Sequence, residues 1–257
     1  MRYILCLSYD GTAFCGWQIQ PASPSVQQAL EEALAKLCGG SVPVTGAGRT
    51  DTGVHAADYV CHFDLTGPLP FEATDFCYKL NAILPRSIAV RSVLPVPDDF
   101  HARFSAVQRS YTYFIHRKKD PFVAAFSWQC GYPALDFDAM NAACRHLLGT
   151  HDFSCFEKTG GANKTSRCTI SEAFWAPYTP SYIQIMDSDP SPSYWYFRVS
   201  ADRFLRNMVR AIVGTLIEVG RGKHDPAWVA ELIATGTRGD AGESVPGHAL
   251  FLSRVRY

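Results

Sequence analysis

The segment Gly48-Arg49-Thr50-Asp51-Thr52-Gly53-Val54-His55-Ala56 is the most informative stretch of this chain. It places one carboxylate, Asp51, two residues after an arginine and two residues before a glycine. Glycine lets the backbone turn tightly and approach a ligand closely, and the guanidinium of Arg49 suits a phosphate or a stacked base. Asp51 is therefore a candidate nucleophile or base, although the local chemistry alone favours a solvated turn with a surface ion pair.

Three better-known motifs fail at this place. A dinucleotide fingerprint would begin at Gly46, but its sixth position is Asp51 instead of glycine. A Walker loop needs Gly-Lys-Ser/Thr, which the segment lacks. An aspartyl phosphotransferase motif around Asp10 needs a second aspartate where Ser8 stands.

The nine residues resemble, without a mismatch, the signature of the tRNA pseudouridine synthase A family. Further blocks resemble this family in the same order along nearly the full chain. They are Tyr9–Thr12 with Gly16–Gln18, Phe100–Ala106 with Tyr111–Tyr113, His151–Phe153, and Phe204–Arg210 with Ile212–Gly214. The segment departs from the family at Arg206-Asn207, where members often carry a histidine.

The resemblance implies an isomerase that converts uridine to pseudouridine in the anticodon stem-loop of tRNA, at about positions 38–40. It assigns the catalytic carboxylate to Asp51, the ring that stacks on the target base to Tyr111, and the partner of the carboxylate to Arg210. Arg49 and Arg206 are further candidates for RNA contacts. No metal or organic cofactor is implied, because the reaction has no redox step. Family members are homodimers that cradle tRNA, so we expect a homodimer.

Composition restricts the class of protein. The 257 residues are 47% hydrophobic and 19% charged, and no apolar run is long enough for a membrane span. The nine cysteines show no metal-ligand spacing and no secretion signal precedes them, which indicates reduced thiols in the cytoplasm. Net charge is zero, whereas nucleic-acid-binding domains are often strongly basic. Charge alone therefore does not predict an RNA partner, although a neutral protein can carry a basic surface.

Periodicity predicts an α+β fold of two tandem ferredoxin-like (βαββαβ) domains, with their sheets side by side and the active site in a cleft between them. The first domain, residues 1–105, carries the Asp51 loop, and the second, residues 106–257, contains insertions. Expected strands cover 3–9, 42–45, 57–65, 88–96, 109–116, 169–176, 194–200 and 249–257. Expected helices cover 26–38, 71–84, 137–148, 203–219 and 226–234. Two polar stretches, 160–167 and 187–193, are expected to be loops.

Several residues have a structural and a functional interpretation. Arg203, Arg206 and Arg210 would share one stripe of the expected helix 203–219, as an RNA-binding or a merely solvated face. We expect Tyr113 and His55 to be structural, and His101 and Arg103 to brace the cleft. His151-Asp152 lacks a third metal ligand at useful spacing.

A rival hypothesis is an RNA-binding module on tandem ferredoxin-like folds without chemistry. Such a module needs no carboxylate at a loop tip.

Overall fold

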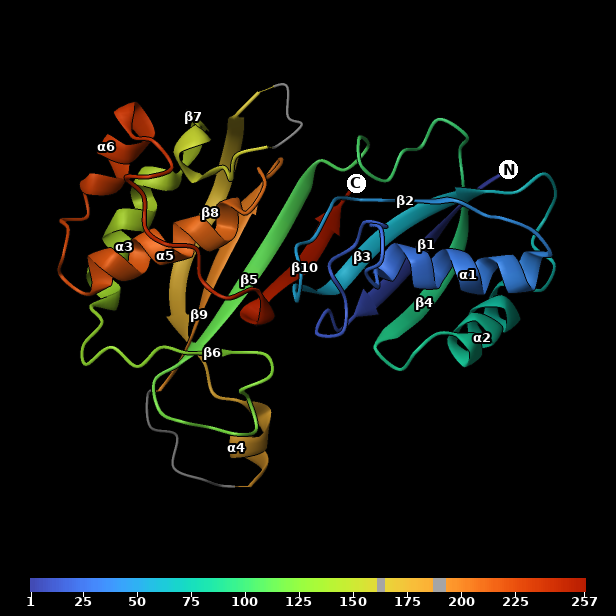
Figure 1. Ribbon diagram of the computed structural model, residues 1–257, viewed down its shortest axis with the longest axis horizontal. Coiled ribbons are helices and arrows are strands. Elements are labelled where there is room, and N and C mark those ends of the chain that lie inside the picture. Colours follow the sequence, from blue (N-terminus) through green and yellow to red (C-terminus); the bar gives the residue numbers. More distant parts are fainter. Residues whose placement is uncertain (161–164, 187–192) are drawn as a thin grey trace. The chain divides into compact units, whose positions relative to one another are not determined.

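The computed structural model describes residues 1–160, 165–186 and 193–257 (Figure 1). These residues form ten strands and six α-helices, which confirms the α+β class. They group into two compact units, one of Met1–Arg109 with Phe251–Tyr257 and the other of Ser110–Leu250. Most of the two expected loops, namely residues 161–164 and 187–192, lies outside the described residues.

The first unit follows the expected βαββαβ order. Its elements are β1 (Arg2–Tyr9), α1 (Val26–Cys38), β2 (Val44–Gly46), β3 (His55–Asp64), α2 (Ala73–Ile83) and β4 (Ile88–Val96). Strand β1 pairs antiparallel with β3 and β4, and β2 pairs antiparallel with β3. Phe251 and Leu252 of β10 (Leu250–Arg256) pair in parallel with β3, so the last strand belongs to this unit.

Helices α1 and α2 contact each other and cover one face of this sheet (Figure 1). Every second residue of β1 is buried, as alternation along a strand predicts. The side chains between the sheet and the helices form the core. They include Leu5, Leu7, Leu30, Leu34, Tyr59, Phe63, Phe76 and Leu80, all fully buried.

Helix α1 begins and ends where its sequence predicts. The Oγ of Ser25 accepts a hydrogen bond from the amide of Gln28, which satisfies a free N–H of the first turn. The Gln28 side chain donates to Glu32, one turn further along the helix. Gly39 ends the helix in the left-handed region at φ 73°.

The second unit contains a sheet with the order β5-β9-β8-β7. Its strands are β5 (Gln108–His116), whose first two residues count with the first unit, β6 (Trp128–Gln129), β7 (Gly149–Asp152), β8 (Arg167–Pro177) and β9 (Tyr194–Ala201). Its helices are α3 (Phe137–Cys144), α4 (Ser181–Ile185), α5 (Met208–Gly220) and α6 (Trp228–Thr235), of which α3 packs on α5. The short elements β6, β7 and α4 were not expected.

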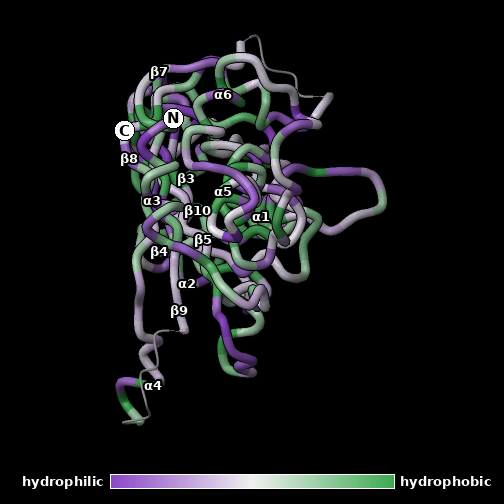
Figure 2. Tube along the Cα trace, turned by 90° about the vertical axis from the view of Figure 1, so that its left-hand side faces the viewer, coloured by the Kyte–Doolittle hydropathy of each residue, from purple (hydrophilic) through white to green (hydrophobic). Residues whose placement is uncertain are grey.

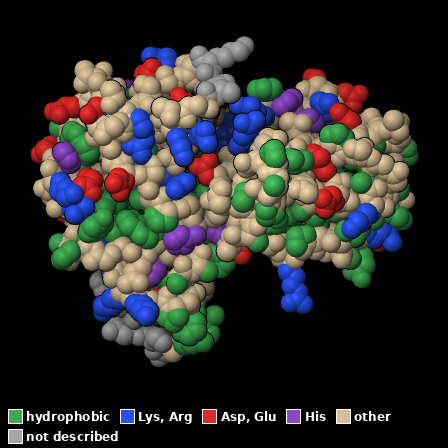
Figure 3. Space-filling view, viewed as in Figure 1, with side chains coloured by type: hydrophobic (Ala, Val, Ile, Leu, Met, Phe, Trp, Pro, Cys, Tyr) green, Lys and Arg blue, Asp and Glu red, His purple; other side chains and the backbone are tan. Residues whose placement is uncertain are grey.

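Helix α4 carries an exposed apolar end. Ile185 and Met186 are mostly exposed there, and Phe122 contacts Tyr182 of the same helix at 5.2 Å between ring centroids. The hydrophobic colouring at the end of α4 is visible in Figure 2, and hydrophobic side chains gather over the same element in Figure 3. The anchor of this element is Asp120, which accepts hydrogen bonds from the hydroxyls of Tyr182 and Tyr194.

The expected helix 203–219 is wrong at its start, because α5 begins at Met208. Asn207 adopts a left-handed backbone with φ 62°, a conformation that asparagine tolerates better than most residues but that a helix excludes. Arg203 and Arg206 therefore precede the helix, and only Arg210 lies on it. The expected stripe of three arginines does not exist.

All nine cysteines are free thiols, and Cys61, Cys130, Cys144, Cys155 and Cys168 are buried. Burial raises the pKa of the Cys155 thiol to about 11 and that of Cys144 to about 12. In residues 1–160, 165–186 and 193–257, no helix has both the length and the apolar character that a membrane span requires.

Candidate functional site

Asp51 lies at a tight turn between β2 and β3. The amide of Val54 donates to the carbonyl of Asp51 at 3.1 Å, and Gly53 takes the left-handed conformation at φ 74° that the turn requires. Within this turn Arg49 is exposed, Asp51 is half-buried and Thr50 is buried. The carboxylate and the guanidinium thus come from one loop, with the carboxylate partly withdrawn from solvent.

The segment after β1 forms one wall of this loop. The amide of Trp17 donates to the carbonyl of Thr50 at 3.2 Å, and the hydroxyls of Tyr9 and Thr50 are 2.9 Å apart. A Cβ on Gly16 would lie 2.3 Å from the Thr50 carbonyl oxygen. A Cβ on Gly11 would lie 2.1 Å from the carbonyl oxygen of Val54. Close backbone approach explains why glycine occupies both positions.

A second wall consists of stacked rings. The ring of Trp17 stacks on that of Tyr59 at 4.2 Å between centroids, and the Tyr59 hydroxyl donates to the carbonyl of Gly48 at 2.5 Å. A Cβ on Gly46 would lie 2.1 Å from the Tyr59 hydroxyl oxygen and 2.6 Å from the Trp17 ring. Tyr59 has no signal in the sequence that would identify it as a support of the loop, since an aromatic residue in a strand is normally a core residue.

His55 closes the loop at its C-terminal end. Its ring is buried, stacks on Phe251 at 4.5 Å, and its Nδ1 lies 3.0 Å from both the amide of Gly11 and the carboxylate of Asp10. Burial would raise the pKa of Asp10, but hydrogen bonds from Thr12 and the nearby His55 lower it overall. His55 therefore has the structural surroundings that the sequence predicts.

The turn around His101 belongs to the first unit. Nδ1 of His101 accepts hydrogen bonds from the amides of Arg103 and Phe104. The Arg103 guanidinium lies 5.6 Å from the centre of the exposed Phe104 ring. Burial and the charge of Arg2 lower the pKa of His101. His101 thus fixes the backbone of its own turn.

The second unit contains the tyrosine candidates. The ring of Tyr111 is half-buried and meets Phe204 edge-on, with 5.0 Å between centroids. Tyr113, two residues later on the same face of β5, is fully buried and donates to the carbonyl of Pro246 at 3.0 Å. Burial raises the pKa of Tyr113 well above its usual value. Of the two rings, the one at Tyr111 is the more open to a ligand.

The second unit also contains the candidate arginines Arg206 and Arg210. Arg210, on the first turns of α5, donates through Nε to the carbonyl of Val245 at 2.7 Å. The amide of Val245 in turn donates to the carbonyl of Arg210 at 3.3 Å. Arg206 is exposed, and its carbonyl accepts from the amide of Lys158. Arg210 is thus fixed by its neighbours, whereas the Arg206 side chain faces solvent.

His151 and Asp152 serve their own hairpin. Nε2 of His151 lies 2.8 Å from the carbonyl oxygen of Leu148, and Asp152 accepts hydrogen bonds from Ser154 and Ser166. Across the described part of the chain, no three histidine, cysteine or acidic side chains gather as metal ligands would.

Comparisons with known proteins agree on one family. A family model described as tRNA pseudouridine synthase matches residues 5–105 and 143–257. The tRNA pseudouridine synthase A of Parabacteroides distasonis is 46% identical over 100% of this chain and 96% of its own length. The proteins of the same name from Porphyromonas gingivalis and Burkholderia thailandensis are 44% and 40% identical, again over 100% of this chain and over 97% and 90% of their own lengths. The motif that contains Asp51 lies inside the matched residues, and this chain belongs to the tRNA pseudouridine synthase family.

Proposed function

We propose that this protein isomerises uridine to pseudouridine in tRNA, with Asp51 as the catalytic carboxylate. The observation that carries this proposal is the way in which the backbone around Asp51 is held. The amide of Trp17 and the hydroxyl of Tyr59 hold its backbone at Thr50 and Gly48, while Asp51 itself stays partly accessible. A rigid scaffold around a half-buried acid is typical of a catalytic group that must meet its substrate in one geometry.

The chemistry needs a single carboxylate. The C1′–N1 bond of uridine breaks, the uracil turns, and C5 bonds to C1′. The proton of C5 then leaves to solvent and N1 takes up a proton, so the product is an isomer of the substrate. Asp51 would act by attack at C6 of the base or by assisting departure at C1′.

We propose the anticodon stem-loop, at about positions 38–40, as the region of tRNA that is modified. The half-buried ring of Tyr111 would stack on the flipped uracil, an interaction that aromatic side chains commonly make with unstacked bases. Arg49 and Arg206, both exposed, would contact the RNA, and Arg210 would act with Asp51 on the same nucleotide.

We further propose that the two halves of the chain, residues 1–105 and 106–257, are ferredoxin-like domains and that the protein is a cytoplasmic homodimer. The βαββαβ order and the antiparallel β4-β1-β3-β2 pairing of the first unit support the fold of the first half. Light scattering should give twice the mass of one chain. A mass of one chain at micromolar concentration would reject the dimer.

The decisive experiment is tritium release from tRNA labelled at C5 of uridine, because formation of the C5–C1′ bond expels that hydrogen. We expect stoichiometric release and pseudouridine at the modified positions. Binding of tRNA without release would favour an RNA-binding module and reject the proposed activity.

The proposed reaction requires no redox step, so we expect no metal or organic cofactor. Dialysis against EDTA should leave the rate unchanged with a tRNA that stays folded without magnesium. Loss of activity that one added metal restores would overturn this expectation.

A further inference from the structure

Arg109, the second residue of β5, joins two segments of the first unit. Its Nη1 donates to the carbonyl of Ala106 at 2.8 Å, and its Nη2 donates to the carbonyls of Arg103 and Ala47, the latter at 3.2 Å. One planar guanidinium therefore binds the turn 103–106 and the residue that immediately precedes Gly48. Its fixed fork of donors suits such simultaneous contacts.

Ala47 is the point where the loop leaves the sheet. Strand β2 ends at Gly46, and the buried Ala47 is the next residue. Its amide still donates to the carbonyl of Val60 in β3 at 2.9 Å. Its carbonyl is held by Arg109. Both backbone groups of Ala47 are thus fixed four residues before Asp51.

The turn 103–106, which Arg109 also binds, is itself held by several hydrogen bonds. The amide of Ser105 donates to the carbonyl of His101, and the Ser105 hydroxyl accepts from the amide of His101. Ala102 donates to Nδ1 of His62 at 3.1 Å and accepts from the hydroxyl of Tyr257 at 2.8 Å. Arg109 therefore ties the start of the loop to a turn that has few ways to move.

We propose that Arg109 is a positioning residue of this enzyme, which fixes the start of the Asp51 loop by binding the carbonyl of Ala47. The role rests on the proposed function, since it matters for turnover only if Asp51 is the catalytic group. A small displacement of a reacting group can lower a rate by about 100-fold. The contribution of Arg109 should therefore be seen in the rate on bound tRNA rather than in affinity.

The test uses Arg109→Lys and Arg109→Gln in the full-length protein, both verified as folded by circular dichroism. Lysine keeps the charge but cannot reproduce the planar fork. We expect single-turnover tritium release from bound tRNA to fall about 10- to 100-fold. For Arg109→Lys the Kd for tRNA should stay within about threefold. Amide hydrogen exchange in residues 46–54 should be faster in both variants than in the wild type.

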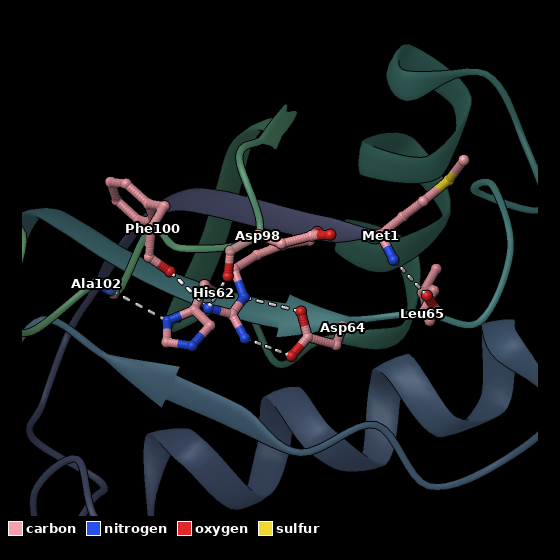
Figure 4. A network of polar contacts seen from close by, with 8 residues as sticks. Met1, His62, Asp64, Leu65, Asp98, Phe100 and Ala102 are labelled. Atoms are coloured by element: carbon pink, nitrogen blue, oxygen red, sulfur yellow. Dashed lines mark hydrogen bonds and ion pairs between the residues drawn. The ribbon is translucent and has the colours of Figure 1, made fainter.

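The matched control is Arg2→Lys. Arg2 also donates to two backbone carbonyls, those of Asp98 and Phe100, and pairs with Asp64 (Figure 4). None of these contacts reaches residues 46–55, so the rate of Arg2→Lys should stay within about threefold of the wild type.

Three results would overturn the role of Arg109. They are a rate within threefold of wild type in Arg109→Lys, unchanged exchange in residues 46–54, or an equal loss of rate in Arg2→Lys. Absence of tritium release by the wild type would instead reject the proposed function, and the exchange measurement would still show whether Arg109 holds the loop.

Discussion

The Asp51 loop and the segment 202–210 are both fixed by distant parts of the chain, but only the loop has a sequence motif that reveals it. The loop is held by groups from four places in the sequence, namely Trp17, Tyr59, Arg109 and its own turn. The segment is also held from a distance, because the amide of Lys158 donates to the carbonyl of Arg206 and Nε of Arg210 donates to the carbonyl of Val245. Asp202 accepts from the amides of Arg203 and Thr169, and Met208 donates to the carbonyl of Leu205.

This difference explains which region the sequence predicts well. Where backbones approach closely, as they do around the Asp51 loop, the chain needs special residues such as glycines, and those residues form a recognisable motif. The segment 202–210 contains no glycine, and the apolar spacing of α5 continues into it. Phe204 thus appears in phase with Met208, although a left-handed Asn207 separates Phe204 from the helix.

The largest expected effect is that of Asp51→Asn, which leaves the loop intact but removes the carboxylate. An amide cannot act as the nucleophile, so tritium release should fall by at least about 1000-fold. The Tm and the Kd for tRNA should stay close to those of the wild type.

Asp58→Asn is the matched control, since Asp58 is an acid of the same unit that pairs with Arg91 at 2.5 Å. Its rate should stay within about threefold of the wild type. Activity of Asp51→Asn within tenfold of wild type would reject Asp51 as the catalytic group.

The second prediction tests whether the walls of the loop are as tight as the structure indicates. Gly16→Ala places a Cβ 2.3 Å from the Thr50 carbonyl oxygen, at a backbone φ of 91°. Overpacking of this kind typically lowers the free energy of unfolding by about 1–3 kcal/mol, and the strained backbone adds about 1 kcal/mol. Urea denaturation measures the loss.

Gly40→Ala serves as the control, because nothing lies within 4 Å of its Cβ position. It should change the free energy of unfolding by less than about 0.5 kcal/mol. A Gly16→Ala variant as stable and as active as Gly40→Ala would show that the backbone at Gly16 and Thr50 accommodates a Cβ without cost.

Much of the fold was predictable because local patterns and long-range packing agree. The alternation of β1, the cap at Ser25 and the glycine at position 39 all indicate the boundaries that β1 and α1 have. The predicted helix 137–148 is interrupted instead, since Arg145–Leu147 tighten into a 3₁₀ turn. The strands β6 and β7 were missed because two to four residues carry too little periodicity.

The candidate site was predictable as a motif but not as a structure. The nine-residue segment identifies Asp51, yet the residues that hold it lie at positions 9–17, 59 and 109. Tyr59 and Arg109 have no sequence signal, because a tyrosine or arginine in a strand usually packs or faces solvent. Their roles arise only when the chain folds and brings them to the backbone of the loop.

A third, smaller effect concerns the buried His62, whose protonation makes the free energy of unfolding depend on pH. His62 is buried, and burial with the charges of Arg2 and His101 lowers its pKa to about 4 from the ordinary 6.5. The unfolded chain therefore binds a proton between about pH 6.5 and 4 that the folded chain does not. The free energy of unfolding should fall over that range as the pH is lowered.

His62→Asn offers an oxygen to the Ala102 amide without titrating in this range. The difference in the free energy of unfolding between wild type and His62→Asn should shift against the wild type from pH 7 to pH 4.5. A pH-independent difference would show that His62 does not titrate with folding. Amide hydrogen exchange in residues 202–210 should be the same in the wild type and in His62→Asn.

The smallest expected effect concerns Arg206, the exposed arginine of the segment that the sequence placed wrongly on a helix. If Arg206 contacts a tRNA phosphate, Arg206→Ala should lower the slope of log affinity against log salt by about 0.7–0.9, the value for one released counterion. Turnover of bound tRNA should stay within about threefold of the wild type.

Lys36→Ala, on the exposed side of α1, removes the same charge and should leave the slope unchanged. Equal slopes for Arg206→Ala and the wild type would mean that Arg206 faces solvent in the complex as well. Of the two exposed arginines proposed to contact the RNA, only Arg49 on the Asp51 loop would then remain.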